Sequence, residues 1–205
     1  MEFIGHFRRL TSVQRNTFIA CFLGWSLDAF DFFILVFCVS AIATQFQTKV
    51  SAIAEAIFIT LAMRPVGAFL FGLMADRFGR RPVIVIFSFI GLLVPLAALY
   101  FQGSLFVLGT LIFIGWSASG TFPLFMGTVP SETIPARFVA TSLGMVVGLG
   151  EILGGVSAPA IAGRAADHYG LRAPVMMMAV CAVVGTVLAL FLRETAPMRL
   201  PRGSP

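Results

Sequence analysis

Residues 17–43 read TFIACFLGWSLDAFDFFILVFCVSAIA, an apolar run in which only Asp28 and Asp31 carry charge. The run holds 27 residues, and about 20 helical residues are enough to cross the ~30 Å hydrocarbon core of a bilayer. A cleavable signal peptide has a shorter apolar core, of roughly 7–15 residues, and a small-residue cleavage site. We therefore expect residues 17–43 to form an uncleaved membrane-spanning helix.

Five more apolar runs follow, separated by short polar connectors. They cover residues 53–75, 83–100, 105–129, 138–162 and 174–192. Of the 205 residues, 59% are hydrophobic and only 11% are charged, whereas a soluble domain has about 25% charged residues. Backbone groups cannot stay unpaired in lipid, and the alternating polarity of a barrel is absent from these runs. The sequence predicts an all-α membrane protein with about six transmembrane helices in residues 17–192, between an N-terminal segment, 1–16, and a tail, 193–205.

The basic residues indicate how these helices are oriented. They stand at the ends of the apolar runs and form no single basic face, so we expect contacts with the lipid bilayer and no nucleic-acid partner. With a cytoplasmic N-terminus, the cytoplasmic set is Arg8, Arg9, Arg15, Arg77, Arg80, Arg81, Arg137, Arg193, Arg199 and Arg202. The opposite set is only Lys49, Arg164 and Arg172. This bias predicts a multi-pass protein of the plasma (cytoplasmic) membrane with both termini in the cytoplasm.

Neither an enzyme nor a metal site is indicated. Cys21, Cys38 and Cys181 are isolated within apolar runs, without the spacing of metal ligands or redox pairs, and we interpret them as small apolar fillers. His6 and His168 stand alone near the expected membrane edges. We expect no cofactor, no metal and no catalytic residue.

Four ionisable residues fall deep within the expected spans: Asp28, Asp31, Arg64 and Glu151. At ~1.5 Å per helical residue, Asp28 and Arg64 each lie ~16 Å from one end of their helix, and Glu151 lies ~20 Å from the inner end of its own. All of them therefore fall near the middle of the bilayer. Ionisable groups at that depth are costly and mark candidate substrate or proton-coupling sites.

Asp28 and Asp31 are three positions apart and share a helical face. Two carboxylates this close in a low-dielectric medium resist ionising together, so at least one is expected to hold a proton, as a proton carrier does. Arg64 stays charged and can neutralise an aspartate or bind the carboxylate of a substrate. Two interpretations stay open, a transport role or a static ion pair that joins two helices. Glu151 is a weaker candidate, because a protonated Glu can simply pack.

Small residues in the run 138–162 indicate helix contacts. Gly144 and Gly148 are four apart, as are Gly150 and Gly154, and this spacing lets helix backbones approach closely in lipid. Packing alone explains the pattern, and a flexible gating helix is the alternative.

The connector after the second run reads GLMADRFGRRP, residues 72–82. Gly79 is expected to allow a tight turn between two helices, and Asp76 can accept hydrogen bonds from an adjacent helix N-terminus. Positive charges alone would hold a connector in the cytoplasm, so the spacing is more specific than a topology signal. The residues of this pattern are Gly72, Asp76, Arg77, Gly79, Arg80 and Arg81.

This connector resembles the signature loop of the major facilitator superfamily, which lies between the second and third helices of its members. Residues 24–33, GWSLDAFDFF, and 61–67, LAMRPVG, are similar to the first two helices of the proton-coupled sialic acid and lactate symporters of that superfamily. The resemblance covers roughly residues 15–85. It implies a conformational latch in the connector and uptake of carboxylate solutes driven by protons. The latch residues that it implies are Asp76, Arg77 and Arg80, and the coupling or substrate residues are Asp28, Asp31 and Arg64.

The second half departs from that pattern. A full member has twelve helices, and this chain has room for six. The run 105–129 lacks the arginine usual in the fourth helix, which places proton coupling in question. Residues 130–137, PSETIPAR, with Glu132 and Arg137, resemble the loop between the tenth and eleventh helices of full-length members, and residues 192–195, LRET, resemble a family C-terminus. The chain thus looks like the front of a transporter joined to its end, with an internal deletion.

Two hypotheses about function follow. The first is a half-length transporter that moves a small organic anion, a monocarboxylate or a sialic-acid-like solute, together with protons, and that forms a parallel homodimer to rebuild a full transporter. The second is a truncated, non-transporting membrane protein or a partner-binding subunit, which the missing arginine and the tail-like second half favour.

Overall fold

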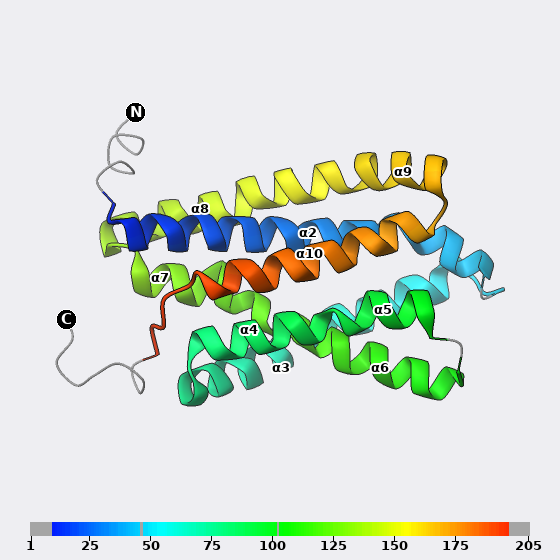
Figure 1. The fold of residues 1–205 in the computed structure, drawn as a ribbon, viewed down its shortest axis with the longest axis horizontal. Helices are drawn as coiled ribbons and strands as arrows, with labels where there is room; N and C mark the ends of the chain where they lie inside the picture. Colours follow the sequence, from blue (N-terminus) through cyan, green and yellow to red (C-terminus); the bar gives the residue numbers. More distant parts are fainter. Residues whose placement is uncertain (1–9, 46, 102, 197–205) are drawn as a thin grey trace.

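The computed structural model describes residues 10–45, 47–101 and 103–196. His6, Arg8, Arg9, Arg199 and Arg202 lie outside the described residues, as do most of the 1–16 segment and the end of the 193–205 tail. Every regular element in the described part of the chain is helical (Figure 1). In chain order the elements are α2 (Ser12–Gln45), α3 (Val50–Phe78), α4 (Arg80–Gly91), α5 (Leu93–Tyr100), α6 (Leu105–Ser117), η1 (Ala118–Thr121), η2 (Leu124–Thr128), α7 (Val129–Thr133), α8 (Ala136–Glu151), η3 (Ile152–Val156), α9 (Ser157–Tyr169) and α10 (Arg172–Leu190).

The long apolar helices confirm the all-α membrane fold. Within the described ranges, five helical stretches are long and apolar enough to cross a bilayer. They are Ser12–Thr44, Val50–Phe78, Arg80–Tyr100, Ala136–Tyr169 and Arg172–Leu190. Each coincides with one of the expected runs and extends beyond it at one or both ends, because the helices continue into the polar membrane edges.

The fourth expected run, 105–129, is not one regular α-helix. The path stays helical to Thr133, but it passes from α6 into the 3-10 turn η1 and the π-helical η2 before α7. Pro123 lacks the N–H that a regular α-helix needs, and Gly120 lies so close to the Phe71 ring of α3 that a Cβ there would overlap it. The expectation of a single regular span is corrected here, since close packing on α3 and a proline reshape the local hydrogen bonding.

Helix α2 lies at the centre of the bundle, packed against α8, η3, α9 and α10 (Figure 1). Glycines allow the close approach: a Cβ on Gly150 would lie 2.8 Å from Cδ1 of Trp25, and one on Gly154 would overlap the backbone of α2. A Cβ on Gly144 or Gly148 would meet no atom within 4 Å. The predicted helix contact is therefore made by the second glycine pair and not by the first.

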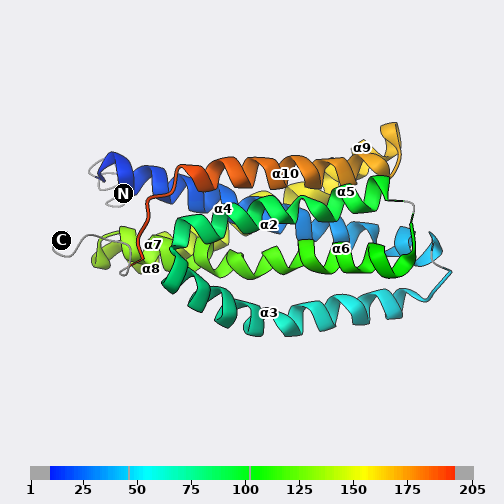
Figure 2. The same ribbon diagram turned by 60° about the horizontal axis from the view of Figure 1, so that its bottom comes forward.

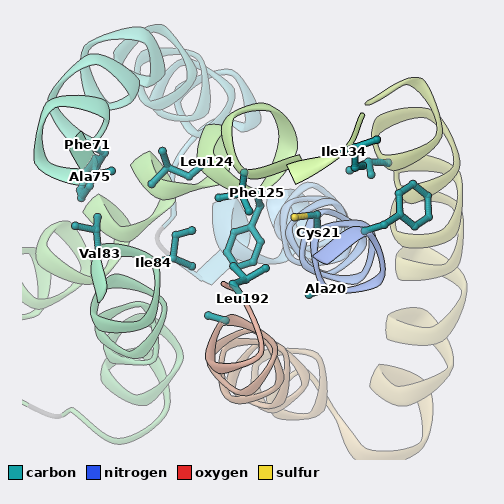
Figure 3. Packing of buried hydrophobic residues seen from close by; sticks show 14 residues of the cluster. Ala20, Cys21, Phe71, Ala75, Val83, Ile84, Leu124, Phe125, Ile134 and Leu192 are labelled. Atoms are coloured by element: carbon teal, nitrogen blue, oxygen red, sulfur yellow. The ribbon is translucent and has the colours of Figure 1, made fainter. Parts of the chain in front are cut away.

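The main buried cluster draws side chains from both halves of the chain (Figure 3). Cys21 of α2, Ile84 of α4, Phe125 of η2 and Leu192 after α10 are all at most 3% exposed. Helix α3 is the least buried of the apolar helices, contains Pro65, and bends along its length at the edge of the bundle (Figure 2).

The connectors separate into two ends of the molecule. One end holds the α3–α4 turn, α7 and the segment after α10, which hydrogen bonds join directly. The start of α2 and the end of α10 lie at this same end (Figure 1). The described part of the predicted cytoplasmic set therefore gathers on one side, as the arginine pattern predicts.

Candidate functional site

Three of the four deep ionisable residues line one cavity of about 130 Å³. Asp28 and Asp31 belong to α2, and Arg64 belongs to α3. The aspartates and Arg64 can line one cavity because α2 and α3 are both long, so that residues in the middle of each helix lie at a similar level of the bundle. The remaining wall is largely apolar and includes Phe32, Trp116, Phe122, Phe125, Met178 and Cys181. Apolar walls with a few convergent polar groups are typical of small-molecule sites.

Arg64 contributes a guanidinium without a salt bridge. Its Cζ lies 5.7 Å from the centroid of the Phe32 ring, which is a cation–π distance. Within the described ranges, Arg64 forms no salt bridge within 4.0 Å; the salt bridges found there belong to Arg80. Because a guanidinium has five N–H donors and no acceptor, Arg64 can still bind a carboxylate that enters the cavity.

The two aspartates share the cavity but differ in their neighbours. Asp28 is 7% exposed, and the charged groups that act on it electrostatically are Arg64 and Glu151. The neighbours of Asp31 are Asp28 and the thiol of Cys181, which lies within hydrogen-bonding reach on α10. Oδ1 of Asp31 is buried and has no hydrogen-bond partner in the described structure. A buried polar atom without a partner is rare and points to a ligand, a proton or a water at that position.

Glu151, the fourth deep residue, does not line this cavity. It ends α8, its side chain is exposed, and the preceding Gly150 is the residue that faces α2. Only its electrostatic interaction with Asp28 connects it with the cavity. The structure thus brings Asp28, Asp31 and Arg64 together and leaves Glu151 on the outer surface of the bundle.

A second polar cluster lies at the predicted cytoplasmic end and centres on Arg80. The Arg80 Nη1 donates to Oδ1 of Asp76 at 2.5 Å, while its Nη2 and Nε donate to the two oxygens of Glu132 at 2.7 and 3.1 Å. The Arg80 side chain is 7% exposed, against 59% for Asp76 and 29% for Glu132. The paired, two-point contact with Glu132 joins the α3–α4 turn to α7.

The segment after α10 completes this cluster. Oε1 of Glu194 accepts a hydrogen bond at 2.8 Å from the backbone N–H of Arg80, and the Thr195 hydroxyl donates to Oε2 of Glu132 at 2.5 Å. Gly79 has the expected tight-turn geometry, with φ of +100°, and the Glu194 carboxylate occupies the space where a Cβ would stand. Asp76, the expected acceptor at an adjacent helix N-terminus, accepts from the side chain of Arg80, the first residue of α4. The backbone N–H of Arg80 donates to Glu194 instead, because the segment after α10 folds across the turn.

The other predicted loop residues stand outside this cluster. Arg77 and Arg137 are exposed and lie over the rings of their neighbours, Phe78 at 5.7 Å and Phe138 at 4.8 Å. The Nη2 of Arg81 donates to the Leu190 carbonyl at 2.8 Å, and a Cβ on Gly72 would meet nothing within 4 Å.

The sequence reasoning missed Cys181, Glu194 and Thr195 as members of these two sites. Cys181 has no local signal, because an isolated cysteine in an apolar run reads as filler. Glu194 and Thr195 belong to the LRET stretch, whose resemblance to a family C-terminus was the one available signal.

Comparison with known proteins agrees with this architecture. Residues 21–205 match the sequence model of the Major Facilitator Superfamily. The sialic acid transporter NanX of Escherichia coli is 26% identical over 195 residues, which cover 93% of this chain and 46% of NanX. The cis,cis-muconate transport protein of Acinetobacter baylyi is 24% identical over 188 residues, 92% of this chain and 45% of that protein.

A third relative, the uncharacterised MFS-type transporter YfnC of Bacillus subtilis, is 33% identical over 144 residues, 70% of this chain and 34% of YfnC. The chain spans less than half the length of each of these three relatives. With its long apolar helices and the matched residues 21–205, the chain belongs to the Major Facilitator Superfamily and is an integral, multi-pass membrane protein.

Proposed function

We propose that the chain is a six-helix transporter unit that moves a small organic anion, a monocarboxylate or a sialic-acid-like solute, in symport with protons. One observation carries the proposal: Asp28, Asp31 and Arg64 come from two helices and line the same apolar cavity. The names of relatives such as the sialic acid and muconate transporters support a carboxylate solute.

Each charged group of the cavity has a role in this proposal. The Arg64 fork, which makes no salt bridge to an aspartate in the described structure, binds the carboxylate of the solute. At least one of the two aspartates carries the proton, because two carboxylates on one helical face in a low dielectric resist ionising together. The apolar wall excludes water and strengthens both interactions. No cofactor is needed for this chemistry.

The Arg80 cluster acts as the conformational latch. It connects the α3–α4 turn, α7 and the segment after α10 through charge-assisted hydrogen bonds. Opening the cavity toward the cytoplasm requires these three segments to separate, so the cluster favours a state closed on that side.

The chain divides into three parts in this proposal: a short cytoplasmic N-terminal segment in residues 1–16, a transmembrane unit in 17–192 and a cytoplasmic tail in 193–205. The transmembrane unit lies in the plasma (inner) membrane of the cell.

A second six-helix unit completes the transporter. The halves of full-length members are related by an axis along the membrane normal, so two copies with the same orientation can form a parallel homodimer. Native mass spectrometry and crosslinking in detergent test this step: a dimer is expected, and monomers that still transport would refute it.

Reconstitution tests the function as a whole. Purified protein in proteoliposomes, with a proton gradient directed inward, is expected to accumulate labelled lactate or sialic acid. Arg64→Ala and Asp28→Asn should abolish the accumulation, whereas Arg172→Ala, an exposed change at the start of α10, should not. A flat response of the wild-type protein to every probe would favour the alternative, a non-transporting or partner-binding membrane subunit.

A further inference from the structure

We infer that the two aspartates of the cavity have different duties: Asp31 keeps a resident proton throughout the cycle, and Asp28 alone exchanges the coupled proton. This inference rests on the proposed function and names the residue that couples it. The observation behind it is that two carboxylates on one helical face have entirely different surroundings.

The surroundings of Asp28 contain a cation. Arg64, from α3, acts on it across the cavity, and Glu151, from α8, is the other charged group that acts on it. The walls from α4, α5, α6 and η2 contribute Ser88, Val94, Trp116 and Phe125 among others, and none of the lining residues from these elements titrates. The negative charge of an ionised Asp28 is therefore balanced by Arg64. Asp28 can accordingly bind a proton and release it again.

Asp31 lines the same cavity as Arg64, but among the described residues no cation is one of the groups that act on it. Its neighbours are Asp28 on its own helix and the thiol of Cys181 on α10, and its Oδ1 is buried without a hydrogen-bond partner in the described structure. A carboxylate in this position would be a buried charge without compensation and close to a second carboxylate, which is costly. Asp31 is therefore stable only as the neutral acid.

The charge balance of the cavity leads to the same assignment. The charged lining residues are Asp28, Asp31 and Arg64, so one resident proton on Asp31 makes the empty cavity neutral. When a monoanion enters and binds Arg64, the cavity regains neutrality if Asp28 takes up one proton. The cavity is then neutral both when it is empty and when it is loaded. A neutral cavity costs least in the hydrocarbon region while the transporter changes the side to which the cavity opens.

The transport step is then balanced. Outside, the anion binds Arg64, and Asp28 takes one proton from water to become a carboxylic acid. Inside, the anion leaves and Asp28 returns that proton to water, while the Asp31 proton stays in place. One anion and one proton cross together, and no net charge moves.

Proteoliposomes with an inward gradient of one pH unit test the division of duties. One coupled proton supports about tenfold accumulation at equilibrium, and two support about a hundredfold. We expect a ratio of about tenfold at equilibrium for wild type, with no effect of a potassium diffusion potential. For Asp31→Asn, whose amide imitates a neutral acid, the readout is the equilibrium ratio and not the rate: uptake slows, but the ratio should still reach about tenfold. Asp28→Asn should lose accumulation but keep exchange of labelled for unlabelled lactate, which needs no net proton movement.

The failures can be told apart. A wild-type protein that neither accumulates nor exchanges lactate or sialic acid would overturn the proposed function itself. A wild-type protein that transports, but with hundredfold accumulation or with voltage dependence, would overturn only the single coupled proton. If Asp31→Asn lost accumulation while it still exchanged solute, Asp31 would not be the resident site.

Infrared spectroscopy gives a readout that needs no solute. Infrared spectra of wild type and of each variant, recorded at pH 6 and at pH 9, report the carbonyl stretch of protonated carboxyl groups. Subtracting the spectrum of a variant from that of wild type at one pH isolates the band of the substituted residue. We expect one buried carboxyl band that persists at both pH values and is missing from Asp31→Asn, and a second band that titrates and is missing from Asp28→Asn. Titration of the Asp31 band over this range would refute the assignment.

Discussion

Arg64, half-buried in the cavity, and Arg80, buried at the predicted cytoplasmic end, are in opposite situations. Arg80 donates to Asp76 and to both oxygens of Glu132, and its backbone N–H donates to Glu194. Arg64 lies over an aromatic ring and makes no salt bridge within the described ranges. The guanidinium of Arg80 is thus paired with protein carboxylates, whereas that of Arg64 keeps N–H donors for a ligand.

The difference separates a structural site from a binding site. A charge that finds all its partners inside the protein stabilises one arrangement of the segments that it joins. A charge in an apolar cavity that is balanced only across the cavity, without a salt bridge, keeps donors free for a ligand of opposite charge. Substitutions of the two arginines should therefore affect different measurements.

The largest expected effect is the loss of transport in Arg64→Ala. Uptake of labelled lactate or sialic acid by proteoliposomes should fall to background, because the one cation among the described residues of the cavity lining is removed. The melting temperature in detergent should change little, because no salt bridge is lost and because Asp28, which loses the cation that balances it, can take up a proton. Arg64→Lys keeps the charge but not the planar fork, and we expect weakened uptake. A strongly destabilised Arg64→Ala protein would show that Arg64 has a structural role after all.

Arg80→Ala should have the opposite profile. The change leaves Glu132 without its main partner and removes the link between α4 and α7, which we expect to cost about 2–3 kcal/mol, since the partners are partly exposed. Thermal unfolding in detergent measures this as a fall in melting temperature of several degrees. Arg77→Ala is the matched control, because Arg77 is exposed and contacts only a neighbouring ring. Equal effects of the two changes would argue against the cluster.

The glycines of the same connector provide a smaller test of the latch. Gly79→Ala must adopt φ of +100° and must displace the Glu194 carboxylate, so it should destabilise the protein by about 1–2 kcal/mol. Gly72→Ala lies inside α3 with nothing within 4 Å of its Cβ, and it should be neutral or should stabilise the helix by up to about 1 kcal/mol. Melting temperatures of the two variants should therefore move in opposite directions; a common direction would contradict the turn geometry.

Sequence alone predicted the spans and the charged lining of the cavity for a physical reason. Length and apolarity determine where a chain crosses lipid, and depth along two long helices places Asp28 and Arg64 at similar levels. The irregular path of the fourth run was not predicted, because it results from the packing of Gly120 on the Phe71 ring of another helix. Periodicity within a run carries no information about such a contact.

Partners far apart in sequence account for the other differences. Glu194 caps the N-terminus of α4 although it is 114 positions from Arg80, and nothing near Asp76 indicates that the segment after α10 folds across the turn. Glu151 has the same depth as the cavity residues but faces outward, because the neighbouring Gly150 is the residue that packs against α2. Depth can be counted from a sequence, whereas the direction of a side chain depends on tertiary packing.

The smallest effect expected is that of Thr195→Val, which removes only the hydroxyl that donates to Glu132 at 2.5 Å. Because Arg80 still binds both oxygens of Glu132, the cost should be about 0.5–1.5 kcal/mol. It should vanish in a Glu132→Ala background, which has no acceptor for the Thr195 hydroxyl, if the two residues act together. Thr60→Val is the control, since that hydroxyl bonds only to the Ala56 carbonyl of its own helix. A double-mutant cycle by thermal unfolding measures the coupling. A cost that persists without the Glu132 carboxylate would mean that the tail is held by its buried apolar residues, and that the polar cluster ends at Arg80.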